Sequence, residues 1–396
     1  MLTKAYVPYR AYYSTPFVRW QGALANENAL VLGGNTSRRF FESRGWDPKM
    51  FDYVILGSTV YQKQWFYGGP WMALLVGATE SPGVLISQAC STGTLGVYQA
   101  GIGIETGLFN NCWCLMADRM SNSPHTVWPN PNGPGGQPIA EDWVMDNFKG
   151  DPWGGPAMVQ TGENVAQEIG VTREQCDDLV LQREAQYELA LANDREFQRR
   201  YMFGVEVQVS KKKTVLVDAD EGVTHSTKEG LAALKPAVPG GVHSVGAQTH
   251  PADANAGLAV TTREKARELS ADPKLEIQIL SYGYFRTKKA FMPAAVAPSA
   301  QAALRNAGLQ IADISVIKTH TPFAINDLAM AKALGLKLSA MNNYGTSLVY
   351  GHPQAPTVAR LVIEGIEELA IKGGGYLLVS GCAAGDTAAS IVLKVG

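Results

Sequence analysis

Cys90 lies at a position where a cysteine side chain could act as a nucleophile. The apolar run 84–86 has strand character, and the small-residue pattern of 91–100 is typical of a helix that begins directly after the cysteine. A thiol at such a junction faces the free N–H groups and the positive dipole end of the helix, which stabilise a thiolate. A thiolate in this place can attack a carbonyl carbon. The competing interpretation is core packing, because free cysteines are among the most buried residues.

Three residues of the C-terminal part could supply acid–base chemistry. His320 follows a strand-like run, His352 stands in a Gly-His-Pro turn before a helix, and Cys382 lies in a glycine-rich turn. Taken singly, each is more readily explained as a structural residue. Together they complete a reaction, since His352 would take the thiol proton and Cys382 would move a second proton. Two oxyanions would form during the reaction, and each needs fixed hydrogen-bond donors. His320 with His352 would serve one oxyanion, and the backbone amides of Cys90 and Ala384 would serve the other.

The elements that must position these residues form two similar halves. Residues 38–56 have the pattern of a helix, a glycine break and a β-rich run, and residues 301–317 repeat that order. A second strand–turn–helix–strand unit follows each copy, and these units hold Cys90 and His352. Strands that alternate with helices predict parallel βαβ units and therefore an α/β protein. Two such halves facing each other would bring equivalent strand ends to a central site.

A segment of different composition separates the two halves. The Pro/Gly-rich stretch 129–138 excludes regular structure, 161–200 has a helical pattern, and 205–209 alternates like a strand. We expect an insertion that covers the site or serves as an oligomerisation arm. The predicted domains are an N-terminal half at 1–122, completed by about 246–272, an inserted cover domain at 123–245, and a C-terminal half at 273–396.

The composition limits the classes of function. The chain has 396 residues, 46% of them hydrophobic, and a net charge of −2 without a long basic run, which argues against nucleic acid as the main partner. It has no run of about 18 apolar residues, so no membrane span is expected. The start lacks the apolar core of a signal peptide, and five cysteines then fit the reducing cytoplasm. Cys112 and Cys114 have the wrong spacing for zinc, and no metal site is predicted.

Five ordered segments between residues 88 and 385 resemble motifs of the thiolase family. The nucleophile motif is similar to 88–93 (Gln-Ala-Cys-Ser-Thr-Gly), and the start of the cover loop and its first helix are similar to 120–125 and 160–166. The base motif is similar to Gly-His-Pro at 351–353, and the Cys-x-Gly-Gly turn is similar to 382–385.

This resemblance implies the thiolase-like layered αβαβα fold, built from two duplicated βαβ halves with an inserted cover loop domain. It also implies the reaction, in which a 3-oxoacyl-CoA is cleaved with CoA, or formed by the reverse Claisen condensation. Cys90 would carry the acyl group, His352 would activate it, and Cys382 would be the second acid–base group. Coenzyme A would be a co-substrate, without a bound cofactor, and the chain would form a homodimer or a dimer of dimers.

The chain departs from the family pattern at several positions. His320 and Thr321 stand where many thiolases have Asn and Glu, and this histidine is similar to the sterol-carrier branch and to the Cys-His-His set of ketoacyl synthases. After Cys382, alanine stands where the family has a glycine. Alanine has fewer allowed backbone conformations than glycine, which restricts the turn whose amides would form an oxyanion hole. The arginine that often binds the CoA phosphate is missing, and His225 and Lys228 are weak substitutes. The expected contacts to CoA or the acyl group are Ala157, Met158, Ser226, Thr227, Lys228, Thr249, His250, Pro322 and Phe323.

The substrate is expected to be bulky, branched or aromatic, as in benzoylsuccinyl-CoA thiolases. Ala157 replaces the histidine that short-chain thiolases often carry, and four aromatic residues precede it: Trp128, Trp143, Phe148 and Trp153. The competing interpretation is that these aromatic residues pack the cover loop. Branches of the family with unusual CoA sites often work with a small zinc-ribbon/OB-fold subunit, so the resemblance, together with the missing phosphate-binding arginine, implies such a partner. Two alternatives stay open, namely a ketoacyl-synthase-like condensing enzyme and a non-catalytic acyl-CoA-binding subunit.

Overall fold

Two sheets of buried strands form the core of the protein, whose computed structural model describes residues 1–396. In spatial order, the first sheet contains β1 (Tyr12–Ser14), β10 (Ala252–Thr261), β5 (Asn111–Arg119), β3 (Tyr53–Gly57) and β4 (Gly83–Ile86), with β2 (Val18–Arg19) beside β10. The second contains β11 (Ile277–Arg286), β14 (Thr387–Val395), β13 (Gly375–Ala383) and β12 (Ile314–Thr319). The pairs β3–β4, β3–β5 and β12–β13 are parallel. Parallel strands need cover on both faces, which the helices supply.

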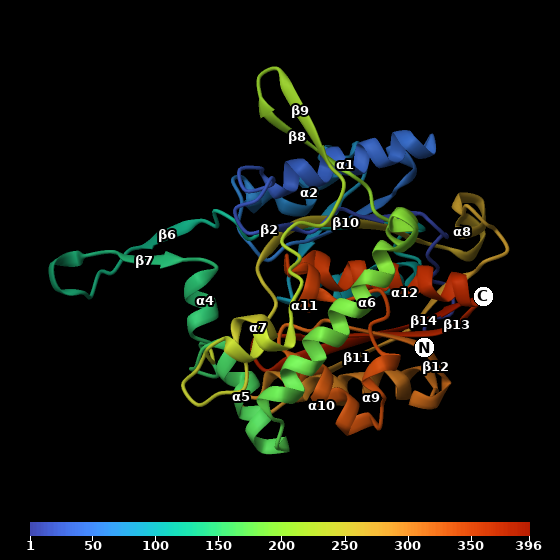
Figure 1. Ribbon diagram of the computed structural model, residues 1–396. Coiled ribbons are helices and arrows are strands. Elements are labelled where there is room, and N and C mark those ends of the chain that lie inside the picture. Colours follow the sequence, from blue (N-terminus) through green and yellow to red (C-terminus); the bar gives the residue numbers. More distant parts are fainter.

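Helices lie in three layers around these two sheets (Figure 1). The outer face of the first sheet is covered by α1 (Ala29–Arg44) and α2 (Gly68–Val76), and that of the second by α9 (Val296–Ala307) and α10 (Ala324–Leu334). Between the sheets lie α3 (Thr92–Thr106) and α12 (Ala355–Lys372). In α12, 15 of 18 residues are buried, as expected for a helix with sheets on both sides. The central helices therefore begin where the two halves meet.

The two halves repeat one order of elements, which confirms the predicted α/β class. Gly45 ends α1 and Gly308 ends α9, with left-handed φ angles of 64° and 71° that glycine adopts without strain. A short 3-10 turn follows each glycine, and β3 or β12 comes next. The second sheet differs at one edge, because a single parallel bridge between Ile317 and Met341 takes the place that β4 has in the first sheet.

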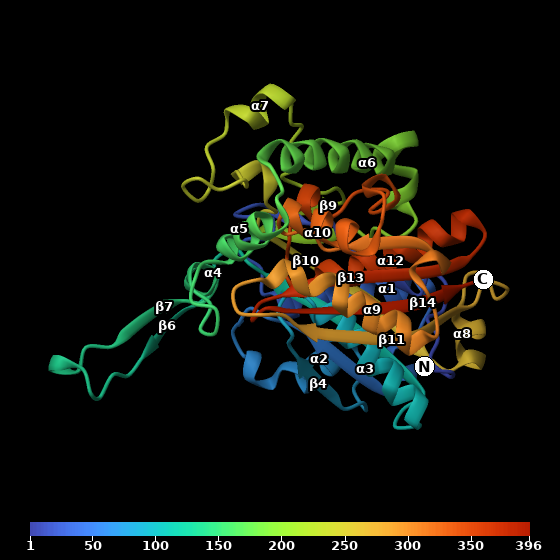
Figure 2. The same ribbon diagram turned by 90° about the horizontal axis from the view of Figure 1, so that it is seen from below.

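The chain between β5 and β10 adds two hairpins and several helices. The hairpins β6 (His125–Trp128) with β7 (Ile139–Asp142) and β8 (Val205–Ser210) with β9 (Lys213–Val217) are joined by α4 (Met145–Lys149), α5 (Met158–Ile169) and α6 (Arg173–Arg199). After β9 comes α7 (Lys228–Ala233). The β6–β7 hairpin projects away from the body in both ribbon views (Figures 1 and 2).

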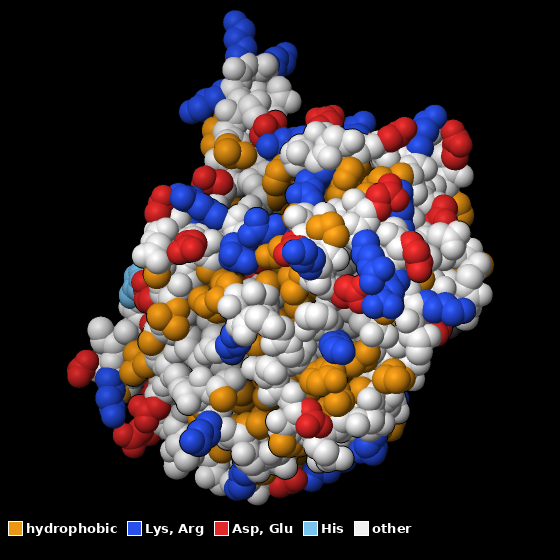
Figure 3. Space-filling model, turned by 90° about the vertical axis from the view of Figure 1, so that its right-hand side faces the viewer, with side chains coloured by type: hydrophobic (Ala, Val, Ile, Leu, Met, Phe, Trp, Pro, Cys, Tyr) orange, Lys and Arg blue, Asp and Glu red, His pale blue; other side chains and the backbone are white.

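The helical pattern at 161–200 is not one continuous helix, because it is divided between α5 and α6 and again at 192–195 within α6, where φ and ψ are not helical. Gly170 ends α5 with a left-handed φ of 69°, and Thr172 then caps α6 through a capping box with Gln175. The remaining helices are α8 (Arg263–Leu269) and α11 (Ser347–Tyr350). None of the helices is both long and apolar enough to cross a membrane. Figure 3 shows that charges of both signs are interspersed on one face, with the β8–β9 hairpin at its top.

Candidate active site

Cys90 lies in the tight turn between β4 and α3. Ala89 has a φ of 44°, a left-handed value that is strained for a residue with a Cβ. The Thr92 hydroxyl holds this turn, because it accepts the N–H of Gln88 at 2.8 Å and donates to the carbonyl of Ala89 at 2.6 Å. The structure thus places the half-buried thiol at a strand-to-helix junction.

Two turns of the C-terminal half bring imidazoles to the same place. His320 follows β12, and its N–H donates to the carbonyl of Ser380 at 2.9 Å. His352 follows Gly351, whose φ is 94°, and a Cβ at this glycine would lie 2.6 Å from Cε1 of His250. Glycine is therefore required before His352. The N–H of His352 donates to the carbonyl of His250 at 2.8 Å.

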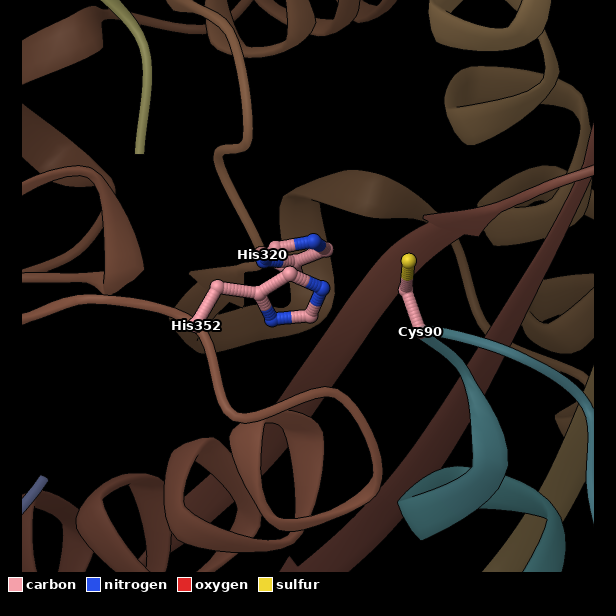
Figure 4. Close-up of side chains that lie close together, drawn as sticks. All are labelled: Cys90, His320 and His352. Atoms are coloured by element: carbon pink, nitrogen blue, oxygen red, sulfur yellow. The ribbon is translucent and has the colours of Figure 1, made fainter. Parts of the chain in front are cut away.

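The thiol and the two imidazoles form one cluster (Figure 4). Sγ of Cys90 and a ring nitrogen from each of His320 and His352 all lie within 4.8 Å of one another. The two ring centroids are 4.0 Å apart, with 30° between the ring planes. In Figure 4, Cys90 comes from the start of α3 and the histidines from segments of the other half. These atom types bind zinc in other proteins, and they are also a nucleophile and two bases for acyl transfer.

Hydroxyl groups behind the rings fix both imidazoles. Oγ of Ser347 accepts the N–H of Thr321 at 3.1 Å and lies 2.7 Å from Nδ1 of His320, to which it can donate its own hydrogen. In that arrangement His320 carries its hydrogen on Nε2. Nδ1 of His352 lies 2.6 Å from Oγ1 of Thr357. Both Nε2 atoms are buried without a hydrogen-bond partner in the protein, which leaves them free to interact with a ligand.

Burial keeps both imidazoles neutral. It lowers the pKa of His352 to about 3, although the neighbouring Gln354 side chain raises that pKa. Burial, and next the neighbouring His352, lowers the pKa of His320 well below its ordinary value. A neutral imidazole can accept a proton at one nitrogen or donate one from the other. The pair therefore has the charge state that a base and a hydrogen-bond donor need.

Burial opposes the expected stabilisation of a thiolate at Cys90 by the helix end. Burial raises the pKa of Cys90 to about 12, and the backbone N–H groups of Ala384 and Cys90 lower it by less. The cost of desolvating the charged sulfur thus outweighs the helix end. The thiol keeps its proton and donates it to Oε1 of Gln354 at 3.1 Å. A base must remove this proton before the sulfur can attack.

A cavity of about 520 Å³ opens in front of Cys90 and His352. Hydrophobic residues make up 13 of its 22 lining residues, and none of the 22 is Lys, Arg, Asp or Glu. A wall of this kind suits an uncharged, mainly apolar ligand, because a buried charge would have no partner there. The predicted residues that the wall contains are Cys90, Met158, Thr249, Pro322, Phe323, His352 and Ala384.

Trp143 and Phe148, from the segment between β5 and β10, form one side of the cavity. Trp143 stacks on Tyr61 with ring centroids 3.9 Å apart, and its Nε1 donates to the carbonyl of Thr59 at 3.0 Å. Its ring is thus fixed against the first half of the chain. The other two aromatic residues of the predicted group are about half exposed and lie off this wall: Trp128 and Trp153.

Cys382 and His320 lie behind the cavity wall rather than on it. Sγ of Cys382 accepts a hydrogen bond from Nδ2 of Asn326 at 3.1 Å. Burial raises the pKa of this thiol well above its ordinary value, and Cys90 raises it further. The structure therefore places Cys382 beside the cluster but without a surface on the cavity.

Three predicted CoA contacts on one segment lie off the wall and already have partners within the chain. The N–H and hydroxyl of Ser226 donate to the carboxylate of Glu184 at 2.7 and 2.6 Å. Thr227 caps α7, and Lys228 pairs with Glu174 at 3.3 Å. The partners of Ser226 and Lys228 are acidic residues of α6, which passes beside this segment.

The other two predicted contacts off the wall are Ala157 and His250. Ala157 stands at the N-terminus of α5, so that the next residue, Met158, reaches the cavity instead. His250 supports the base, since its carbonyl accepts the N–H of His352.

Two functional residues were missed by sequence reasoning. Gln354 contacts the thiol and lines the cavity, but nothing in its residue type signals this place. Asp118 accepts hydrogen bonds from the N–H groups of Thr59, Val60 and Ala355, and so ties the end of β5 to the start of α12. An acidic residue in the buried run before Arg119 is a signal that could have revealed Asp118.

Comparison with protein-family models covers almost the whole chain. Residues 11–263 match the model for the thiolase N-terminal domain, and residues 274–395 match that for the thiolase C-terminal domain. Among solved structures, human mitochondrial 3-ketoacyl-CoA thiolase in complex with CoA has a TM-score of 0.90 and 24% identity, over 99% of this chain and 98% of that chain. This likeness confirms the predicted layered αβαβα fold.

Two curated relatives indicate the same family. The acetyl-CoA acetyltransferase of Escherichia coli (strain K12) is 28% identical over 382 residues, which cover 95% of each chain. The peroxisomal 3-ketoacyl-CoA thiolase A of Mus musculus is 30% identical over 316 residues, which cover 78% of this chain and 71% of that protein. The chain therefore belongs to the thiolase family.

Proposed function

We propose that this thiolase-family acyltransferase cleaves a 3-oxoacyl-CoA with CoA, or catalyses the reverse Claisen condensation, through an acyl group on Cys90. The observation that carries the proposal is the cluster of Cys90, His320 and His352, whose reactive atoms lie within 4.8 Å of one another. Cys90 and His352 are also on the wall of the cavity, where a carbonyl carbon can reach the sulfur. A nucleophile beside a neutral base is the arrangement that acyl transfer needs.

In the first half of the reaction, Nε2 of His352 takes the thiol proton and Sγ of Cys90 attacks the ketone carbon. The Nε2–H of His320 and the backbone N–H groups of Cys90 and Ala384 supply donors for the oxyanions. The bond between the carbonyl carbon and its neighbour then breaks, and Cys382 or His352 returns a proton to the leaving carbon. In the second half, the thiol of CoA loses its proton to the same groups and attacks the acyl-Cys90 carbonyl.

The acyl group that fits the cavity is uncharged and bulky. Trp143, Phe148 and Met158 provide an apolar side, and the lining contains no Lys or Arg to pair with a carboxylate. A branched or aromatic acyl group satisfies both conditions, and the benzoyl group of a benzoylsuccinyl-CoA is one example, with the succinyl carboxylate placed outside this lining. A panel of 3-oxoacyl-CoAs tests this point, since a preference for acetyl over all bulky groups would contradict it.

The assembly that we propose contains a second copy of the chain and, for the CoA phosphate, a small zinc-ribbon/OB-fold subunit. Val127, Trp128 and Ile139 are exposed on the projecting β6–β7 hairpin, which supports a protein contact there. Ser226 and Lys228 are paired within the chain, which leaves the phosphate without an evident partner. Light scattering of the purified chain, alone and with its co-purifying proteins, tests the assembly.

Replacement of the two thiols tests the reaction. Cys90→Ser is expected to reduce thiolysis by on the order of 10³-fold or more, because the nucleophile is lost. Cys382→Ala is expected to abolish thiolysis as well, whereas near-normal condensation in this variant would favour the ketoacyl-synthase-like alternative. Cys176→Ala, which changes a buried cysteine outside the site, serves as the matched control.

A further inference from the structure

Gln354 has a strained backbone at the position that follows the turn of His352. Its φ is 62° and its ψ is −107°, and it lies directly before the first residue of α12. A residue with a Cβ is rarely found in this region, and such strain persists only where the surrounding structure enforces it. Strained residues of this kind gather at functional sites, which makes Gln354 a candidate for a role in the reaction.

The backbone on the C-terminal side of Gln354 is held by two hydrogen bonds. The N–H of Ala355 donates to Oδ2 of Asp118 at 3.0 Å, and the N–H of Thr357 donates to the carbonyl of Gln354 at 3.1 Å. Gln354 is only 5% exposed, so its side chain has little freedom. The carboxamide is therefore directed at one place rather than exposed to solvent.

That place is the reactive sulfur. Sγ of Cys90 lies 3.1 Å from Oε1 of Gln354 and donates its hydrogen to that oxygen. Nε2 of His352 has no hydrogen-bond partner in the protein, although it belongs to the same cluster. The thiol proton is thus directed to the carboxamide and away from the base.

We propose that Gln354 is a further catalytic residue, whose carboxamide oxygen holds Cys90 as a neutral thiol until a ligand enters the cavity. The inference rests on the proposed role of Cys90 as the nucleophile. Because Gln354 is on the cavity wall, an entering thioester meets its side chain. The proton then passes from Sγ to Nε2 of His352, which leaves a thiolate and an imidazolium and requires no other reactant. A hydrogen bond to the neutral thiol disfavours its charged form, and His352 reverses this preference only when the ligand displaces the carboxamide.

Alkylation of Cys90 by iodoacetamide at several pH values tests the proposal, with peptide mass spectrometry to separate Cys90 from the four buried cysteines. In Gln354→Met the thiol loses its acceptor, so alkylation at neutral pH is expected to be about twofold to tenfold faster than in the wild type. In Gln354→Glu alkylation is expected to be slower, because a carboxylate is a stronger acceptor and its charge opposes a thiolate.

Gln248→Met is the matched control, because Gln248 also lines the cavity but donates to the carbonyl of Ser244 rather than contacting the thiol. Its alkylation profile is expected to follow the wild type. An unchanged or slower rate in Gln354→Met, or a faster rate in Gln354→Glu, would overturn the proposal, and the Glu variant decides alone if the Met variant does not fold. Alkylation needs no acyl-CoA, so a protein that shows these shifts but no thiolysis refutes the proposed function, whereas the hold of Gln354 on the neutral thiol stands.

Discussion

The two strand-to-helix junctions of the central layer hold their functional side chains by different means. Before α3, the hydroxyl of Thr92 closes the turn, and both of its hydrogen bonds stay within that turn. Before α12, the anchors come from distant segments, since Asp118 accepts the N–H of Ala355 and His250 accepts that of His352. The turn of the nucleophile is therefore closed by local hydrogen bonds, with one tie across the halves from the hydroxyl of Ser91 to the carbonyl of Gly381 at 2.7 Å. The base, in contrast, is placed mainly by the packing of one half on the other.

This difference shows how a duplicated fold can give two unlike groups to one site. Each junction contains a non-glycine residue with a left-handed φ, Ala89 at 44° and Gln354 at 62°. In the first junction the strain places the sulfur at the cavity. In the second it places the carboxamide of Gln354 against that sulfur. Contact between the groups then depends on anchors such as Asp118 that cross from one half to the other.

Loss of the Asp118 anchor is expected to have the largest effect on this arrangement. In Asp118→Asn, an NH₂ group would face N–H and O–H donors that the carboxylate now accepts from Ser58, Thr59, Val60 and Ala355. We expect the free energy of unfolding to fall by about 3 kcal/mol. We also expect kcat/KM for thiolysis to fall by roughly 100-fold, because the base loses its position. Urea denaturation and thiolysis above pH 7 measure both, since burial raises the pKa of Asp118 to about 6.

Asp253→Asn is the matched control for this variant. Asp253 is also a buried carboxylate, but it accepts the N–H groups of Met120 and Ser121 and makes no hydrogen bond to α12. The Asp253→Asn variant is expected to have a lower free energy of unfolding, whereas its kcat/KM for thiolysis falls much less than that of Asp118→Asn. Equal losses of kcat/KM in the two variants would contradict a specific role of Asp118 at the second junction.

Sequence reasoning predicted what depends on local patterns and missed what depends on distant contacts. Cys90, His352 and the repeated order of elements were predictable because a strand–cysteine–helix junction, a Gly-His-Pro turn and helix-ending glycines are local signals. Gln354 was not predictable, since its left-handed φ is imposed by surroundings rather than by its residue type. The hydrogen bond of Ser226, a predicted CoA contact, to Glu184 on α6 was likewise not predictable, because the two residues lie 42 positions apart.

Acid is expected to destabilise the protein through the neutral histidines of the second junction. Burial lowers the folded-state pKa of His352 to about 3, so between about pH 6.5 and 3 the unfolded state binds a proton that the folded state does not. The free energy of unfolding therefore falls as the pH falls, by about 1.4 kcal/mol per pH unit for this histidine. In His352→Asn, the loss between pH 6.5 and 5 should be about 2 kcal/mol smaller.

Urea denaturation at several pH values measures this slope. The exposed His225 gives the control variant His225→Asn, since its side chain is 76% exposed. Parallel curves of unfolding free energy against pH for the wild type and His352→Asn would show that His352 takes up protons equally in the folded and unfolded states. This result would contradict the predicted role of His352 in acid destabilisation.

A smaller effect is expected from the hydroxyl behind the base. Thr357→Val removes the oxygen that lies 2.6 Å from Nδ1 of His352, while the side chain keeps its shape. We expect kcat/KM to fall roughly fivefold, as for the loss of one hydrogen bond, with a shift in its pH profile. The third residue of α3, Thr94, gives the matched variant Thr94→Val, because its hydroxyl bonds only to the carbonyl of Ser91. A pH profile that shifts equally in both variants would contradict the orienting role of Thr357.

The central claim, that Cys90 carries the acyl group, is tested most directly by intact-protein mass spectrometry. The protein is incubated with a panel of acyl-CoAs and 3-oxoacyl-CoAs, and the modified peptide is then mapped. The account predicts one acyl group on Cys90, removed by free CoA, with bulky uncharged acyl groups retained best. If no ester modifies Cys90 in protein whose thiol still reacts with iodoacetamide, the claim is contradicted and the non-catalytic acyl-CoA-binding alternative is favoured.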